Sequence, residues 1–250
     1  MVEQTAPERD PRPVSGPGRC GALDARVLLG EARRPPEPLP VRPVPLRKRM
    51  LDLMCAGVAL VVLAPVLLVA LLGVRVTSRG PALFRQVRIG RAGMPFTMLK
   101  LRTMYVDGDA SAQREFNTRE LLDPEFVPPT EDGSYKDADD GRITPIGRFL
   151  RRYSLDELPQ LVNIVRGDMS LVGPRPSLPW EVELYPEWGR RRAAVPPGVT
   201  GLWQVSGRNR LSMIEMLELD RRYVDEWSLR TDLRCLLRTP AAIVQGDGAS

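Results

Sequence analysis

Residues 53–74 read LMCAGVALVVLAPVLLVALLGV, a run of 22 residues without a charged side chain. A helix that crosses the hydrocarbon core of a bilayer needs about 20 apolar residues. A buried helix of a soluble protein is the alternative, but such helices rarely lack polar residues over this length. The run therefore predicts a helix embedded in a membrane.

Pro65 lies near the middle of this run. Because a proline inside a helix removes one hydrogen bond and clashes with the preceding turn, we expect a break or kink there. Basic side chains flank the run on both sides, namely Arg47, Lys48 and Arg49 before it and Arg75, Arg79, Arg85 and Arg88 after it. Positive charge marks the cytoplasmic side of a membrane helix, so a re-entrant hairpin over residues 46–79, broken at Pro65, satisfies both flanks. The alternative is an ordinary kinked span whose topology is set by other features.

The composition of the 250 residues restricts the chemistry further. The net charge is +5, but residues 1–50 contribute +4 of it and the other 200 residues only +1, so we expect no nucleic-acid partner. The chain has no histidine, which excludes Ser-His-Asp catalysis, histidine metal ligands and an imidazole base. Its 3 cysteines are too few and too scattered for a zinc site or a disulfide framework, and they fit a reducing compartment.

The domain organisation follows from changes in composition along the chain. Residues 1–45 contain ten of the 25 prolines and no apolar periodicity, which predicts a disordered arm. Residues 120–140 carry eight acidic side chains and one lysine, which is typical of a solvated insertion loop. We expect a catalytic domain over residues 80–240, with this loop inside it and residues 241–250 as a tail.

Amphipathic helices are predicted over residues 142–153, 212–227 and 232–238, the last ending before Pro240. Ser212 and Glu215 form a capping box at the start of the second. Such helices either line a core or lie flat at a lipid interface, and periodicity does not separate the two. No glycine-rich loop follows a strand pattern, which argues against a Rossmann or P-loop nucleotide site.

The segment SLDELPQ (154–160) places Asp156 and Glu157 at the start of a further helix. Ser154 and Glu157 have the spacing of a capping box, which is the structural interpretation. An ionised aspartate at the positive end of a helix, near a divalent cation, is also a competent nucleophile toward phosphorus. From the residues alone both interpretations stay open.

Two glycine-rich segments carry arginines that suit phosphate binding. In GPRP (173–176), two prolines fix the backbone around Arg175, whose guanidinium can bind two phosphate oxygens at once. The alternative there is a plain turn with a surface arginine. The second segment, PGVTGLWQVSGRN (197–209), contains Arg208 and glycines that permit tight turns.

In the order of its motifs the chain resembles the bacterial sugar transferase family, the monotopic polyprenol-phosphate phosphoglycosyl transferases. The resemblance covers about residues 46–240, and its motifs are FRQVRIG (84–90), KLRTM (100–104), SLDELPQLVNIVRGDMSLVGPRP (154–176), PGVTGLWQVSGRN (197–209) and LDRRYVDEWSL (219–229). It implies a mainly helical α/β fold, in which a re-entrant membrane helix broken at Pro65 carries a small cytosolic catalytic domain on amphipathic interfacial helices. It also implies the bacterial cytoplasmic membrane, with the catalytic domain and both termini on the cytoplasmic face.

The resemblance further implies a reaction and its residues. The family transfers a sugar 1-phosphate from a UDP-sugar to polyprenol (undecaprenyl) phosphate and releases UMP, in the first membrane step of exopolysaccharide, O-antigen or glycan assembly. Asp156 is the implied nucleophile, which forms a covalent aspartyl-phosphosugar, and Glu157 supports it with Mg²⁺ held by both carboxylates. The implied substrate- and phosphate-binding residues are Arg175 and Arg208, with Lys100, Arg102, Asp168 and Asp220 as further candidates.

The implied partners are therefore a UDP-sugar, polyprenol phosphate and inner-membrane lipid, and a homodimer is a further expectation. Two other interpretations compete with this one. The first is a membrane glycosyltransferase that moves only the sugar and releases UDP. The second is a catalytically silent membrane adaptor that uses the same scaffold.

Overall fold

The computed structural model of the chain describes residues 41–105, 111–123, 141–207 and 211–245. Most of the predicted N-terminal arm (1–40), most of the predicted acidic loop (124–140) and Arg208 lie outside the described residues. The residues that are described all belong to one compact unit, which begins at Pro38.

Most of the described residues are helical, as the sequence predicts. The α-helices are α2 (Leu46–Thr77), α3 (Ser111–Leu122), α4 (Pro145–Arg152), α5 (Gln160–Arg166), α6 (Pro179–Leu184), α7 (Met213–Asp225) and α8 (Leu229–Gln245). The 3-10 helices are η1 (Arg91–Gly93), η2 (Leu155–Glu157) and η3 (Glu187–Ala194). The strands are β1 (Leu83–Ile89), β2 (Pro95–Leu101), β3 (Ser170–Val172) and β4 (Gly198–Thr200).

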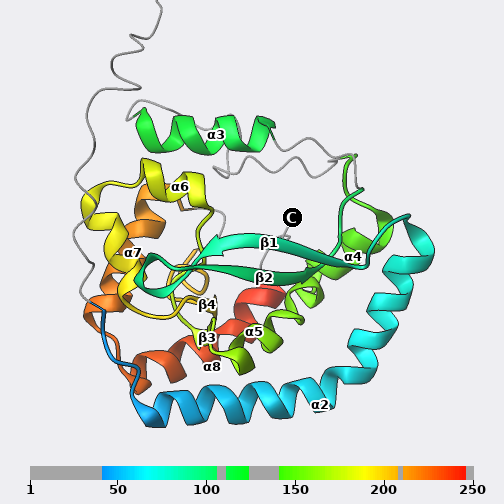
Figure 1. The fold of residues 1–250 in the computed structure, drawn as a ribbon, viewed down its shortest axis with the longest axis horizontal. Coiled ribbons are helices and arrows are strands. Elements are labelled where there is room, and N and C mark those ends of the chain that lie inside the picture. The colour runs from blue at the N-terminus through cyan, green and yellow to red at the C-terminus, as the bar shows by residue number, and fades with distance from the viewer. Residues whose placement is uncertain (1–40, 106–110, 124–140, 208–210, 246–250) are drawn as a thin grey trace, which may run out of the picture. The chain divides into compact units, whose positions relative to one another are not determined.

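The apolar run forms α2, one continuous helix of 32 residues with Pro65 inside it. The helix changes direction along its length (Figure 1), so the expected kink is confirmed. The expected break is wrong, because a proline removes one hydrogen bond and the remaining bonds carry the helix onward. By length and composition α2 can cross a membrane.

Both ends of α2 pack against the same compact unit. Near its start, Ala56 lies in a cluster with residues of α5 and β2. Near its end, Ala70 and Val74 lie in a cluster with residues of β2 and α4. Most of the large apolar side chains between these contacts are exposed, among them Val61 and Val69. The apolar surface available to lipid is therefore the middle of the helix.

A buried polar network fixes the first turns of α2. Lys48 Nζ lies 2.9 Å from Asp232 Oδ2 and 3.7 Å from Asp52 Oδ1, and the Lys48 residue is only 3% exposed. The Ser170 hydroxyl donates to Asp52 Oδ1, and the Tyr223 hydroxyl donates to Asp232 Oδ1. Burial, reinforced by the charge of Asp232, raises the pKa of the Tyr223 hydroxyl, which keeps it a donor. We call Lys48, Asp52, Tyr223 and Asp232 the α2 anchor, because they join α2 to α7 and α8.

Two small sheets complete the mainly helical α/β fold that the resemblance implies, although the positions of their strands were not predicted. β1 and β2 form an antiparallel hairpin near the centre of Figure 1, with Leu83 opposite Leu101 and Ile89 opposite Pro95. β3 and β4 form a parallel pair in which Ser170 lies opposite Gly198. The hairpin could have been predicted from the glycine-containing turn that separates two segments of strand length in the sequence.

The predicted helix starts are confirmed where a capping residue marks them. The Ser212 hydroxyl accepts a hydrogen bond from the Glu215 N–H, and the Glu215 side chain reaches back to Ser212, so the predicted capping box begins α7. The helix predicted over residues 142–153 is α4, which starts later because the Thr144 side chain caps it.

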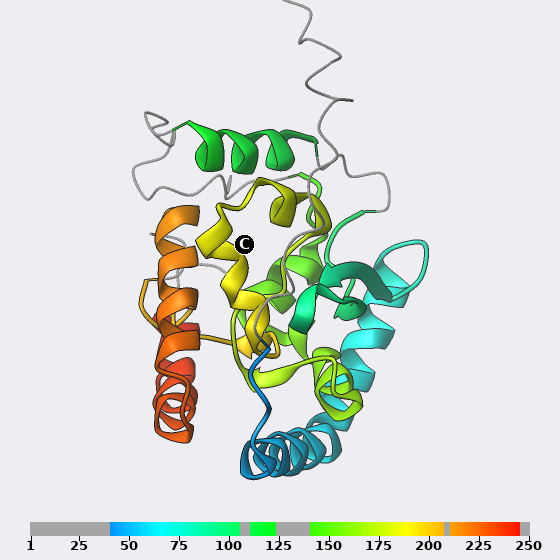
Figure 2. The ribbon, with the colours of Figure 1, turned by 60° about the vertical axis from the view of Figure 1, so that its left-hand side comes forward.

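The end predicted for the last helix is wrong. α8 starts at Leu229 and continues through Pro240 to Gln245. Asp232 and Cys235 are buried, so core packing holds the first turns, and one missing hydrogen bond at Pro240 does not end the helix. Residues 241–245, predicted as part of a tail, are therefore helical. Figure 2 shows α7 and α8, in orange and red, following one another along one side of the unit.

Candidate active site

The two acidic residues of SLDELPQ lie in η2, a single 3-10 turn between α4 and α5. Ser154 precedes this turn with φ 54°, a left-handed conformation that is uncommon for a residue other than glycine. The Ser154 side chain makes no capping hydrogen bond, and α5 starts only at Gln160. The capping-box interpretation of Ser154 and Glu157 is therefore wrong, because the Ser154 side chain does not cap a helix. Strained backbone of this kind is common at functional sites.

Asp156 is a buried carboxylate beside charged neighbours. The residue is 8% exposed. Burial raises the pKa of Asp156 to about 6, although Lys100 opposes the shift; the neighbouring Glu157 adds to it. Lys100 Nζ forms a half-buried ion pair with Glu157 Oε1 at 2.9 Å. The lysine on β2 and the acidic pair on η2, predicted as site residues, are thus brought together.

Arg151, the penultimate residue of α4, is a second cation at this position. Its charge acts on Asp156 and favours the ionised carboxylate. Its Nε donates to the Thr103 hydroxyl at 2.9 Å, which orients the guanidinium. In the sequence Arg151 is one of several arginines in the predicted helix over residues 142–153, and its place beside Asp156 was not predicted.

Arg88 on β1 is a third cation, on which the charge of Glu157 acts. Its guanidinium is buried and donates to Gln86 Oε1 and to the Pro176 carbonyl oxygen, both neutral acceptors. Burial and the nearby Arg175 charge lower the pKa of Arg88 to about 10, and Glu181, Tyr185 and Glu157 partly offset this. Among the described residues no carboxylate lies within ion-pair distance of Arg88, so its charge is available to an anion.

Arg175 lies in the turn after β3, and its side chain is exposed. Its guanidinium carbon lies 6.0 Å from the centre of the Trp203 ring, a cation–π distance. Trp203 belongs to the second glycine-rich segment, which the parallel pairing of β3 and β4 brings beside GPRP. A Cβ on Gly198 would collide with the backbone nitrogen of Gly173, so this close approach requires glycine.

Two predicted phosphate ligands have structural roles instead. Arg102 is buried and donates to the carbonyl oxygens of Ser78 and Arg79, just beyond the end of α2. Asp168 accepts from the Asn163 amide at the C-terminal end of α5. The seven residues of α5 span about 10 Å, and η2 lies at the other end, so Asp168 is remote from Asp156.

Asp220, the third such candidate, is fully buried and cannot reach a substrate. Its carboxylate forms an ion pair of 2.5 Å with Arg192. Burial raises the pKa of Asp220 to about 6, whereas Arg192 and Arg175 both oppose the shift. Asp220 is thus linked to the Arg175 turn through Arg192 and is closed off from solvent, so it does not make the predicted contact with substrate phosphate.

Comparison with known proteins identifies the family. The model of the bacterial sugar transferase family matches residues 44–246 of the chain. The chain belongs to this family.

Named relatives include a UDP-glucose:undecaprenyl-phosphate glucose-1-phosphate transferase of Caulobacter vibrioides, which is 42% identical over 227 residues that cover 86% of this chain and 76% of that protein. The exopolysaccharide production protein ExoY of Sinorhizobium fredii is 39% identical over 216 residues, covering 86% of this chain and 93% of the relative. An undecaprenyl-phosphate galactose phosphotransferase of Salmonella typhimurium is 38% identical over 204 residues, covering 81% of this chain but 41% of the relative.

The donor set of this sugar transferase fits a magnesium ion that is shared with a substrate. Among the described residues no group of three or more His, Cys, Asp or Glu side chains could hold a metal by itself. Asp156 and Glu157 are adjacent oxygen donors, and Mg²⁺ usually takes one or two carboxylates, with phosphate oxygens and water as the other ligands. The predicted metal ligands therefore suit Mg²⁺ only together with a phosphate-bearing ligand.

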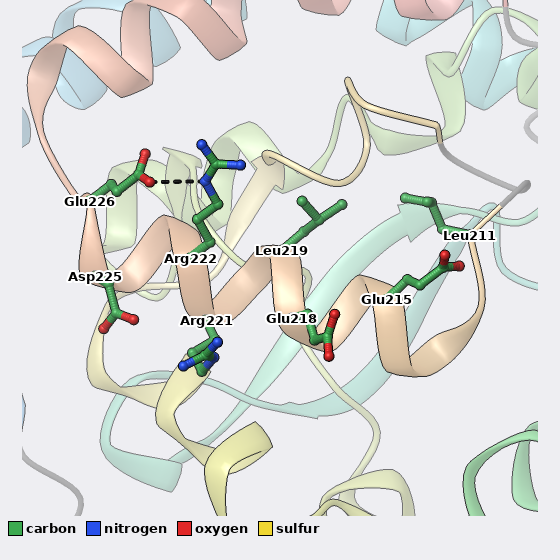
Figure 3. A pocket seen from close by; sticks show the side chains of 8 residues that line it. All are labelled: Leu211, Glu215, Glu218, Leu219, Arg221, Arg222, Asp225 and Glu226. Carbon is green, nitrogen blue, oxygen red and sulfur yellow. Dashed lines mark hydrogen bonds and ion pairs between the residues drawn. The ribbon is translucent and has the colours of Figure 1, made fainter. Parts of the chain in front are cut away.

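A surface pocket of about 520 Å³ on the sugar transferase lies elsewhere, along α7 (Figure 3). Its lining is Leu211, Glu215, Glu218, Leu219, Arg221, Arg222, Asp225 and Glu226. The Arg222 side chain in it is paired with Glu226, as the dashed line in Figure 3 marks. None of the predicted site residues lines this pocket, so the candidate active site is defined by its converging charges instead.

Proposed function

We propose that this protein transfers a sugar 1-phosphate from a UDP-sugar to a polyprenol phosphate such as undecaprenyl phosphate and releases UMP. The observation that carries the proposal is the surroundings of Asp156, a buried carboxylate on which the charges of Lys100 and Arg151 act. Arg88 and Arg175, whose charges act on one another, add two further cations, and the charge of Glu157 links Arg88 to the acidic pair. The names of the Caulobacter and Salmonella relatives support the same reaction class. The exopolysaccharide relative suggests a place at the first membrane step of glycan assembly.

In the first step, a carboxylate oxygen of Asp156 attacks the sugar-bearing phosphorus. A new bond forms between this oxygen and phosphorus, while the bridging bond to the second phosphate breaks and UMP leaves with the electron pair. Arg88 and Arg175 would neutralise the oxygens on which charge accumulates. The raised pKa of Asp156 matches a nucleophile that is ionised at neutral pH yet retains basicity.

In the second step, a phosphate oxygen of the polyprenol phosphate attacks the same phosphorus. The bond to Asp156 breaks, the carboxylate is regenerated, and a polyprenyl diphosphate sugar leaves. Lys100 holds Glu157 next to the nucleophile at this stage. A bound Mg²⁺, held by Asp156 and Glu157, would supply charge neutralisation for the phosphate oxygens.

For the membrane helix we propose the re-entrant topology, with the catalytic unit and both chain ends on the cytoplasmic face. The supporting observation is that Ala56 and Val74, near the two ends of α2, both pack against this one unit. A straight span would carry its two ends to opposite sides of the bilayer, about 30 Å apart. A re-entrant helix also brings the unit to the surface where the lipid acceptor resides.

Nucleotide release tests the reaction. The full chain in nanodiscs is given Mg²⁺, undecaprenyl phosphate and a panel of UDP-sugars, and the nucleotide products are separated. We expect UMP from one donor, none with Asp156→Asn, and unchanged release with Asp225→Asn, an exposed aspartate of α7. Trapping the phosphosugar on the protein by omitting the acceptor tests the covalent intermediate.

Other products would favour the competing functions. UDP in place of UMP would assign the protein to transferases that move only the sugar. No nucleotide from any donor, together with genetic complementation that survives Asp156→Asn, would favour the silent adaptor. Accessibility of tags at Met1 and Ser250 tests the topology: tags on opposite faces would refute the re-entrant helix.

A further inference from the structure

The backbone of the Arg175 turn is held by guanidinium groups from two distant segments. Arg192 Nη2 in η3 donates to the Arg175 carbonyl oxygen at 2.6 Å. Arg88 Nη1 in β1 donates to the next carbonyl oxygen, that of Pro176, at 3.0 Å. Two successive carbonyls that follow the Arg175 Cα are thus engaged by guanidinium groups, and the Pro174 carbonyl before it accepts from the Gly198 N–H. These contacts fix the backbone from which the Arg175 side chain leaves the turn.

Arg192 is itself fixed by a buried partner. Its side chain is 11% exposed and forms the 2.5 Å ion pair with Asp220, whose side chain is 0% exposed. Its Nη1 donates to the Tyr185 hydroxyl at 3.1 Å, and its guanidinium carbon lies 5.5 Å from the centre of the Tyr185 ring. Neither Asp220 oxygen has a hydrogen-bond partner in the part of the chain that the structure describes, so the ion pair is its principal contact.

A buried ion pair of this kind is weak evidence for stability, because removing two charges from water offsets much of their attraction. Such pairs are better explained by what they orient. Asp220 is closed off from solvent, and the Arg192 guanidinium is engaged by Asp220, Tyr185 and the turn. Of this set, the group that can reach a substrate phosphate is the exposed Arg175 side chain.

We propose that Arg192 and Asp220 are positioning residues, which act on the transfer reaction only by holding Arg175 at the substrate phosphate. The inference rests on the proposed function, since Arg175 receives its phosphate-binding role there. A lysine at position 192 keeps the charge beside Asp220, but its single ammonium cannot reproduce the planar fork that joins Asp220, Tyr185 and the Arg175 carbonyl.

A double-mutant cycle on UMP release separates positioning from a general structural role. We expect Arg192→Gln to slow UMP release about 10- to 100-fold, because small misplacements of a substrate-binding group have effects of this size. In an Arg175→Ala background the same substitution should change the rate by less than about two-fold, since no side chain is left to position. Equal factors in both backgrounds would overturn the proposal.

Matched variants keep the test independent of folding. Arg191→Gln alters an exposed arginine of the same 3-10 helix and should leave the rate unchanged. Arg192→Lys and Asp220→Asn preserve size, and both should fall between the wild type and Arg192→Gln. A rate for Arg192→Lys equal to the wild-type rate would contradict the need for the planar fork.

Amide hydrogen exchange provides a readout that does not depend on catalysis. In Arg192→Gln we expect faster exchange in a peptide covering residues 170–178 and unchanged exchange in α5. Unchanged exchange in the turn would overturn the proposal even if activity falls. If the wild-type chain releases no UMP from any donor, the proposed function fails, whereas faster exchange of the turn would still support the hold of Arg192 on Arg175.

Discussion

The α2 anchor and the surroundings of Asp156 are both clusters of charges, yet they are built in opposite ways. In the anchor, Lys48 lies between Asp52 and Asp232 and each charge has a buried partner. Around Asp156, in the part of the chain that the structure describes, the cations Lys100 and Arg151 act on a carboxylate that is not ion-paired to either, and Arg88 donates only to neutral acceptors. Every charge of the α2 anchor is paired within the protein, whereas the Arg88 charge near Asp156 has no carboxylate within ion-pair distance among the described residues.

This difference shows how to distinguish a structural cluster from a reactive one. Breaking a complete buried network leaves an uncompensated charge, so its substitution acts on folding. Around Asp156 burial raises the pKa and so destabilises the free protein with its carboxylate ionised, whereas the neighbouring cations favour an anionic ligand. Substitutions in the two clusters should therefore change stability and activity in opposite patterns.

The largest effect is expected for Asp156→Asn. The proposed nucleophile is lost, so UMP release should fall by about 10⁴-fold or more. Because the pKa of Asp156 is raised to about 6 in the fold, the ionised carboxylate destabilises the protein above that pH and the protonated form does not below pH 4. The variant should therefore be more stable than wild type at pH 8, by about 1–2 kcal/mol, and equally stable at pH 4.

Chemical denaturation of the solubilised chain at both pH values measures this stability change. Lower stability of Asp156→Asn at pH 8 would show that the carboxylate belongs to a complete network like the anchor. Retained UMP release would remove Asp156 from the reaction.

Lys48→Met should have the reverse effect. It leaves Asp52 and Asp232 without their buried cation, and the free energy of unfolding should fall by about 3–5 kcal/mol. The activity of the fraction that remains folded should stay within a few-fold of wild type. Arg47→Met, at an exposed neighbouring position, is the control and should leave stability within about 0.5 kcal/mol. A specific loss of activity at full stability would contradict the structural role of the anchor.

Lys100→Met should shift the pH dependence of the reaction. In the wild type, UMP release should fall as the pH drops below about 6, because Asp156 becomes protonated. Lys100 keeps that pKa from rising further, so its removal should move the acidic limb of the profile to higher pH. At pH 7 the rate should fall about two- to ten-fold, and the loss should shrink as the pH rises further. A limb that moves to lower pH, or does not move, would separate Lys100 from the nucleophile.

Arg49→Gln is expected to have the smallest effect. Its guanidinium donates to the carbonyl oxygens of Ile164 and Val165 at the end of α5, in a partly exposed position near the anchor. The free energy of unfolding should fall by about 1 kcal/mol with unchanged UMP release, because both acceptors are neutral and solvent is close. A loss as large as that of Lys48→Met would show that exposed contacts contribute as much as the buried network.

Much of the catalytic segment could be predicted from the sequence, because its signals are local. SLDELPQ contains its two acidic residues whatever the fold, and GPRP stiffens its own backbone through two prolines. The roles of cations were harder to predict. Lys100 and Arg102 are two residues apart, yet Lys100 contacts Glu157 and Arg102 contacts the end of α2.

The roles of three further cations could not be predicted from the sequence at all, namely those of Arg88, Arg151 and Arg192. In the sequence each is one arginine among several neighbours, and a charged residue on a helix or strand is usually a solvated one. Their roles depend on partners that are distant in the chain, such as Pro176 for Arg88 and Asp220 for Arg192. No local pattern encodes such a contact.

By itself the sequence determined the apolar helix with its internal Pro65, the cap of α7 and the acidic pair at 156–157, since each depends on residues within a few positions of one another. The tertiary structure decided that α2 continues through Pro65, that Asp220 is buried, and that Lys100 of β2 and Arg151 of α4 meet at Asp156. The physical reason is that burial and charge pairing depend on which segments pack together, and packing is a property of the whole chain.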